Sequence, residues 1–142
     1  MPKKNKVVSG SLLSFDFGMK HIGVAVGDTF SQTAQPLTRL KATDGIPKWD
    51  KIAALINEWS IIAMVVGIPV NLDGSAQNIT AAAAKFGRRL HNKFKLPVFE
   101  ADERLTTKEA KSISAELNKK AKEFDSLAAA LILESWLREH GD

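Results

Sequence analysis

The pattern of apolar and polar positions in the first forty residues predicts three consecutive β-strands. Ser11–Phe17 is an almost continuous apolar run, which is typical of a buried strand. His21–Val26 alternates, with three larger aliphatic side chains on one face and the small Gly23 and Ala25 on the other. Thr33–Leu40 predicts a third strand, and the proline within it favours an edge position. The short turns between these strands indicate an antiparallel meander.

Helical spacing and short apolar runs then alternate along the chain. Apolar residues recur at helical spacing over Trp49–Trp59, and Ile61–Ile68 is a continuous apolar run, as in a strand covered on both faces. A second helix is expected from Gln77 to about Phe94, and Pro97–Glu100 begins another short strand. Tryptophans at this spacing indicate core packing more than stacking on a base.

The C-terminal part of the chain predicts two further helices. A capping box at Thr106–Glu109 opens a helix that should end near Leu117. Asn118–Glu123 reads as a charged connector, and the last helix is expected from about Asp125 to His140. The first turns of that helix are nearly all apolar, so it should pack deeply.

This order of elements indicates a single α/β domain built on a mixed sheet. The two later strands each follow a helix, so they should lie parallel to one another. No internal repeat or domain linker is evident. We interpret residues 1–10 as a basic, flexible N-terminal segment and residues 11–142 as the domain itself.

Composition adds mainly exclusions. No apolar stretch reaches the roughly 18–20 residues of a membrane helix, and the apolar run after the basic N-terminus contains Asp16, so it does not read as a signal peptide. The chain has no cysteine, which excludes disulfides, thiolate zinc sites and a cysteine nucleophile and is compatible with a cytoplasmic protein. The net charge of +4 mildly favours an anionic partner such as nucleic acid, although a generically basic protein is the simpler explanation.

Asp16 is the strongest candidate for chemistry. It lies inside the apolar run of the first strand, where a charged carboxylate is costly to bury without a cation or another partner. Glu103 would lie just past the last strand and Asp125 at the N-terminus of the last helix, so the three carboxylates could converge if that helix crosses the sheet. Converging carboxylates repel one another and need cations. Oxygen ligands suit Mg²⁺ or Mn²⁺, and two such ions can activate water for phosphodiester cleavage.

Each carboxylate also has a plainer explanation. Asp125 followed by Ser126 is a good N-cap sequence. Asp102 and Glu103 could be surface charges paired with Arg104. The sequence leaves these alternatives open, and Asp16 is the hardest of the carboxylates to explain in this way.

Other polar residues could serve a nucleic-acid substrate. Gly18 and Lys20 follow the first strand, where backbone N–H groups and an ammonium could meet a phosphate. The loop Asn71–Gln77 opens the second helix, whose N-terminus is a natural anion site, although an ordinary surface loop explains it equally well. The basic residues of the second helix are more simply a solvated face. The candidate nucleic-acid-binding residues are Gly18, Lys20, Asn71, Asp73, Gln77, Arg104 and Thr106.

Four segments form a pattern that is specific as a set, although any one alone would be weak: Leu12–Asp28, Val65–Gly74, Asp102–Ala110 and Asp125–Leu133. In this order they resemble the YqgF/RuvX family of Holliday junction resolvases, also described as pre-16S rRNA nucleases. The resemblance covers nearly the whole chain after Ser9.

The resemblance implies an RNase H-like fold, with a five-stranded mixed sheet in the order 3-2-1-4-5 flanked by helices. It implies that Asp16, Glu103 and Asp125 form an acidic triad that acts with Mg²⁺ or Mn²⁺. It also implies a bacterial, cytoplasmic role in maturing the 5′ end of 16S rRNA. The partners it suggests are precursor rRNA, branched DNA or the ribosomal small subunit, with the protein a monomer or weak dimer.

The function predicted first is therefore metal-dependent phosphodiester hydrolysis in 16S rRNA processing. The alternatives are a resolvase acting on four-way DNA, which rests on fold analogy, and a non-catalytic RNA-binding factor in ribosome assembly. An ATP-binding protein of the actin or sugar-kinase type ranks last, because such proteins need two domains around the nucleotide and this chain supplies one.

Overall fold

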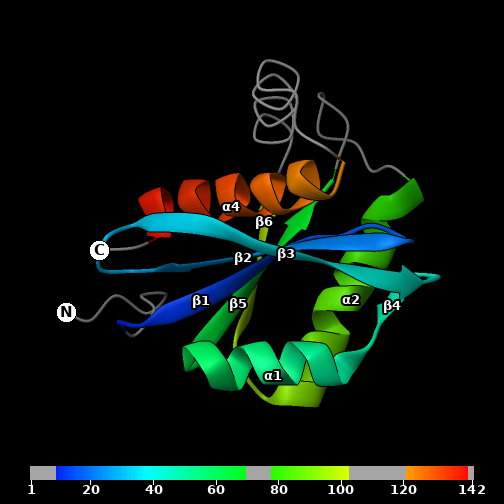
Figure 1. Ribbon diagram of the computed structural model, residues 1–142, viewed down its shortest axis with the longest axis horizontal. Helices are drawn as coiled ribbons and strands as arrows, with labels where there is room; N and C mark the ends of the chain where they lie inside the picture. Colours follow the sequence, from blue (N-terminus) through cyan, green and yellow to red (C-terminus); the bar gives the residue numbers. More distant parts are fainter. Residues whose placement is uncertain (1–8, 70–77, 103–120, 141–142) are drawn as a thin grey trace.

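A single mixed sheet forms the centre of the computed structural model, which describes residues 9–69, 78–102 and 121–140. The strands are β1 (Ser11–Asp16), β2 (His21–Asp28), β3 (Thr33–Thr43), β4 (Ile46–Pro47), β5 (Ile61–Ile68) and β6 (Val98–Asp102). The helices are α1 (Trp49–Trp59), α2 (Asn78–Phe94) and α4 (Ala121–His140). Helix α4 covers one face of the sheet, and α1 and α2 cover the other (Figure 1).

The strand order is β4-β3-β2-β1-β5-β6. This confirms the predicted order of the five expected strands, with β1–β2–β3 as an antiparallel meander and β5 and β6 parallel to β1. The predicted count of five is wrong by one. Asp44 and Gly45 both have positive φ, at 52° and 79°, as a type I′ turn requires, and this turn folds Ile46–Pro47 back onto β3 as a sixth strand.

Successive side chains along a strand pack on opposite faces of the sheet, one covered by α1 and α2 and the other by α4. Leu13 and Phe15 of β1 are fully buried in the core beneath α1 and α2. Leu12 points the other way and packs with the α4 residue Trp136. Trp49 of α1 stacks on Phe86 of α2, with ring centroids 6.0 Å apart, so its predicted role in the core is confirmed.

Helix α4 begins four residues before the position that the sequence predicts. It starts at Ala121, so Asp125 lies in its second turn and is not its N-cap. The predicted connector Asn118–Glu123 is therefore wrong over its last three residues, which are helical. Ala, Lys and Glu are good helix formers, and they extend the helix past the apparent Asp-Ser cap. The predicted helix Thr106–Leu117 lies outside the described residues.

None of the helices in the described ranges is both long and apolar enough to cross a membrane.

Candidate active site

Asp16 ends β1 on the face of the sheet that α4 covers. Side chains along a strand alternate, so Asp16 shares a face with Ser14 and Leu12. The Ser14 hydroxyl donates a hydrogen bond of 2.7 Å to the backbone carbonyl of Ala129 in α4. Asp16 is partly buried, in contrast to the fully buried Phe15 beside it. The carboxylate is therefore placed at the edge of the layer between sheet and helix.

Asp125 of α4 lies directly over a glycine of β2. Gly23 is the register partner of Asp16, and its Cα lies against the backbone carbonyl of Asp125 so closely that an added Cβ would fall on that oxygen. Ala25 and Gly27 continue this small-residue face under Ala129 and Leu133. The predicted face of Gly23 and Ala25 thus lets α4 approach the sheet closely.

One turn of α4 advances by about the same distance as two residues of β1. Four helical residues advance about 6 Å, and two strand residues advance about 6.6 Å. Ala129 contacts Ser14, so one turn earlier Asp125 stands at the level of Asp16. Asp16 and the backbone of Asp125 therefore lie at the same end of the sheet, on the face that α4 covers.

Arg39 of β3 completes the arrangement from the other side. Its Nη1 lies 3.3 Å from Oδ2 of Asp125, and about a quarter of each side chain is exposed. Arg39 is also the register partner of Gly23. Because exposed ion pairs contribute little stability and this one is only partly shielded, its main effect is to fix where the Asp125 carboxylate lies.

A single row of register partners therefore crosses the sheet beneath the start of α4. In strand order it consists of Arg39, Gly23, Asp16, Gly67 and Ala101. Asp16 is at the centre of this row, with a glycine on either side. No bulky side chain of a neighbouring strand therefore stands directly beside the carboxylate.

Of the other predicted residues, only Gly18 and Lys20 lie in the part of the chain that the structure describes. Gly18 and Lys20 lie in the turn after β1, at the same end of the strands as Asp16, and Lys20 is exposed. An added Cβ at Gly18 would fall on the carbonyl oxygen of His21, so the tight turn itself requires this glycine. The predicted residues that lie outside the described ranges are Glu103, Arg104, Thr106, Asn71, Asp73 and Gln77.

The donor set of Asp16 and Asp125 fits a hard divalent cation. Both side chains supply carboxylate oxygens, which are the ligands that Mg²⁺ and Mn²⁺ prefer. Within residues 9–69, 78–102 and 121–140, no group of three or more potential metal-ligating side chains occurs. The third predicted ligand, Glu103, lies outside those ranges.

Arg39 is the residue that sequence reasoning missed. The pattern identified its strand, but the register of β3 on β2 shifts between Val24 and Ala25, next to Pro36. A shift of one residue moves every side chain to the opposite face. A strand reading alone therefore could not assign Arg39 to the face of Asp16.

Curated bacterial proteins match nearly the whole chain. A protein of Coxiella burnetii (strain Dugway 5J108-111) is 52% identical over 98% of this chain and 97% of its own length. A protein of Pseudomonas aeruginosa (strain LESB58) is 49% identical over 92% of this chain and 94% of its own length. Both carry the name "Putative pre-16S rRNA nuclease".

A solved structure shares the fold. The RuvC protein of T. thermophilus, in complex with a Holliday junction substrate, aligns with a TM-score of 0.52 over 92% of this chain and 96% of that chain. The identity is 17%, so this likeness concerns the fold alone. It confirms the predicted RNase H-like architecture.

The family assignment rests on sequence. The sequence model of RuvX, described as Holliday junction resolvase, matches residues 10–139, which is almost the entire chain and includes all four segments of the predicted pattern. The chain belongs to the RuvX family.

Proposed function

We propose that this protein is a metal-dependent nuclease that hydrolyses phosphodiester bonds in processing the 5′ end of precursor 16S rRNA. The observation that carries the proposal is that one glycine lies next to both aspartates: Gly23 is the register partner of Asp16, and the backbone carbonyl of Asp125 packs against it. The names of the bacterial relatives supply the substrate class. Family membership supports nuclease chemistry in general.

Asp16, Asp125 and Glu103 are the proposed ligands of Mg²⁺ or Mn²⁺. Ala101 of β6 packs on the α4 side of the sheet, and Glu103 follows it by two residues in the sequence. Such ions, when bound, lower the pKa of a bound water and neutralise charge on the phosphate. The chain's own contribution is to hold the two aspartates in place through the Ser14–Ala129 bond and the close contact at Gly23.

Other residues of the site have proposed roles in holding the substrate. Arg39 keeps the Asp125 carboxylate oriented, and its guanidinium can donate further hydrogen bonds to a phosphate oxygen. Gly18 and Lys20 lie where backbone N–H groups and an ammonium can contact the adjacent phosphate. The remaining proposed contacts are those of Asn71, Asp73, Gln77, Arg104 and Thr106.

The second candidate substrate is a four-way DNA junction. The description of the RuvX family and the fold shared with a resolvase favour it. A junction resolvase must cut two strands symmetrically, so this activity requires a dimer. Cleavage of precursor rRNA needs only a monomer or weak dimer, acting in the cytoplasm on the precursor or on the ribosomal small subunit that carries it.

A cleavage panel distinguishes these functions. Purified protein is incubated with precursor 16S rRNA, unstructured RNA and a four-way DNA junction, each with Mn²⁺, with Mg²⁺ or with excess EDTA. We expect a defined product at the 5′ end of the rRNA precursor that disappears in EDTA, because carboxylates without a cation cannot accept the phosphate.

Three other results of this panel would contradict the proposed function. Cleavage that persists in EDTA would refute metal dependence. Symmetric cutting of the junction, with the rRNA left intact, would replace rRNA processing by junction resolution. Binding of RNA without any product would indicate a non-catalytic assembly factor.

A further inference from the structure

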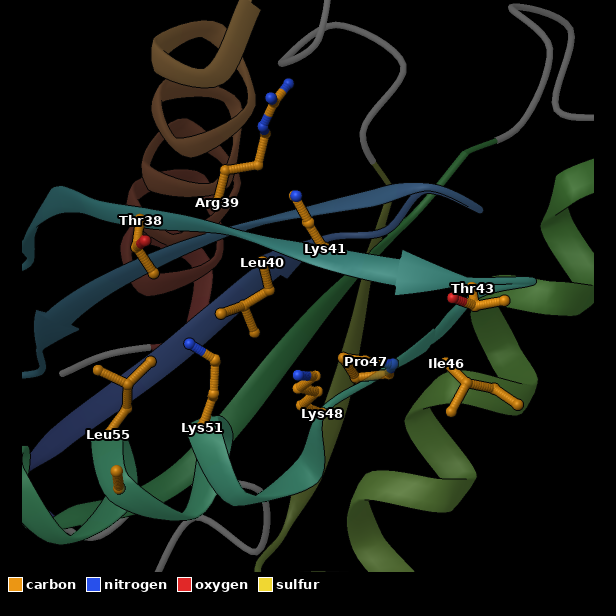
Figure 2. A pocket seen from close by; sticks show the side chains of 11 residues that line it. Thr38, Arg39, Leu40, Lys41, Thr43, Ile46, Pro47, Lys48, Lys51 and Leu55 are labelled. Carbon is orange, nitrogen blue, oxygen red and sulfur yellow. The ribbon is translucent and has the colours of Figure 1, made fainter.

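An open groove lies between strand β3 and helix α1, on the opposite side of β3 from α4 (Figure 2). It has a volume of about 820 Å³. Beyond Ala42 and Thr43, which pair with β4, the outer edge of β3 has no strand partner within the described residues. Figure 2 shows Thr38 and Leu40 pointing into the groove from β3, and Lys48, Lys51 and Leu55 bordering it from the side of α1.

The charges around this groove all have the same sign. Its cationic side chains are Arg39, Lys41, Lys48 and Lys51, and no aspartate or glutamate is among the residues that line it. The three lysines are exposed, and none of them makes an ion pair in the described part of the chain. Three lysines at a groove whose lining contains no carboxylate indicate an anionic occupant.

The floor of the groove is apolar. Leu40 is buried, and Leu55 is partly buried beside the exposed Ala54. Ile46 is an exposed large apolar side chain at one end. Cations at the rim and apolar surface below suit a single nucleic-acid strand, whose phosphates contact lysines while its bases cover apolar surface.

The groove is continuous with the site through Arg39. This residue lines the groove and also holds Asp125 with its guanidinium. Figure 2 shows Arg39 and Lys41 pointing to the α4 side of β3, with Lys48 and Lys51 on the other side. The cations therefore flank β3 on both sides and form a path from Asp125 to α1 (Figure 2).

We propose that this groove binds the single-stranded RNA that flanks the cleaved bond, with Lys48 and Lys51 contacting its phosphates. The proposal rests on the proposed nuclease function, which supplies the RNA. A second copy of this chain is the less suitable occupant, because the chain carries a net charge of +4 and offers no carboxylate here.

The test compares two double variants that each remove two positive charges. Lys48→Gln/Lys51→Gln changes the groove, and Lys85→Gln/Arg88→Gln changes exposed residues of α2, away from the groove lining. All four side chains are exposed, so both variants should fold, which circular dichroism and thermal unfolding check. Affinity for a fluorescent unstructured RNA is measured by anisotropy in EDTA, so that nothing is cleaved, over a range of salt concentrations.

The groove variant is expected to lose two phosphate contacts. Each contact with a single strand contributes about 0.7 to the slope of log K against log salt, so the slope should fall by about 1.4 and the Kd at 0.1 M salt should rise roughly 25-fold. The α2 variant should change the Kd by no more than about twofold, because its charges act only through screened long-range attraction.

Equal affinities for the two variants would overturn the proposal. A shift in self-association by the groove variant, measured by sedimentation with RNA binding unchanged, would also overturn it and assign the groove to a second copy. The nuclease function fails separately: weaker RNA binding by the groove variant, with no cleavage by the wild type in Mn²⁺, would support the groove and refute the nuclease.

Discussion

Asp16→Asn is expected to lower the rate of metal-dependent RNA cleavage by at least about a thousandfold, equivalent to roughly 4 kcal/mol of transition-state stabilisation. Asp16 stands at the centre of the row that runs under α4, with Gly23 and Gly67 beside it. A carboxamide is nearly the same size but carries no charge, so it cannot offset the charge of a divalent cation. The unfolding free energy should stay within about 1 kcal/mol of the wild type, because the number of heavy atoms and the shape of the side chain are unchanged.

Asp50→Asn is the matched control for this variant. It makes the same chemical change at an exposed residue in the first turn of α1. Initial rates at fixed Mn²⁺ and thermal unfolding are measured for both variants. If Asp16→Asn keeps more than about a tenth of the wild-type rate while Asp50→Asn behaves normally, Asp16 does not have the role assigned to it here.

Gly23→Ala is expected to destabilise the protein by about 3 kcal/mol, the upper part of the usual range for overpacking. The new methyl group would fall on the backbone carbonyl of Asp125. Backbone lies on both sides of this contact, so no rotamer change can relieve it, and α4 must move away from β2. That movement carries Asp125 away from Asp16, so cleavage should fall together with stability.

Gly87→Ala is the same substitution at another glycine, but we expect it to increase stability. Gly87 lies within α2, where an added Cβ would be 3.6 Å from Cγ1 of Val98, an ordinary contact. Alanine should therefore stabilise this helix by about 0.5–1 kcal/mol. Urea denaturation of both variants tests the pair. Equal midpoints for Gly23→Ala and the wild type would show that α4 does not pack on β2 as described.

The periodicity of apolar residues alone predicts most of the helices and strands. Ile61–Ile68 is a strand with the predicted limits, since a continuous apolar run of this length fits a strand buried on both faces. The alternation in β2 also predicted that Gly23 and Ala25 share one face, and α4 packs on that face. In both cases the signal is local in sequence and direct in its physical meaning.

Features that depend on tertiary context were harder to predict. The Asp-Ser pair resembles a cap and so predicts a helix start at Asp125, whereas the helix formers before it extend α4 to Ala121. The contact between Arg39 and Asp125 joins residues 86 positions apart and depends on an irregular strand register. A hairpin turn at Asp44-Gly45 was recognisable in principle, since this dipeptide is a strong hairpin signal.

The most direct test of the account is a calorimetric titration with Mn²⁺ of the wild type, Asp16→Asn and Asp125→Asn, without substrate. Loss of a group that only supports a metal ligand typically costs 10- to 100-fold in affinity, so loss of a ligand itself should cost at least about a hundredfold. We predict that the wild type binds Mn²⁺ and that both variants lose this binding to a similar extent. Wild-type affinity in either folded variant would contradict the claim that these two carboxylates form one cation site.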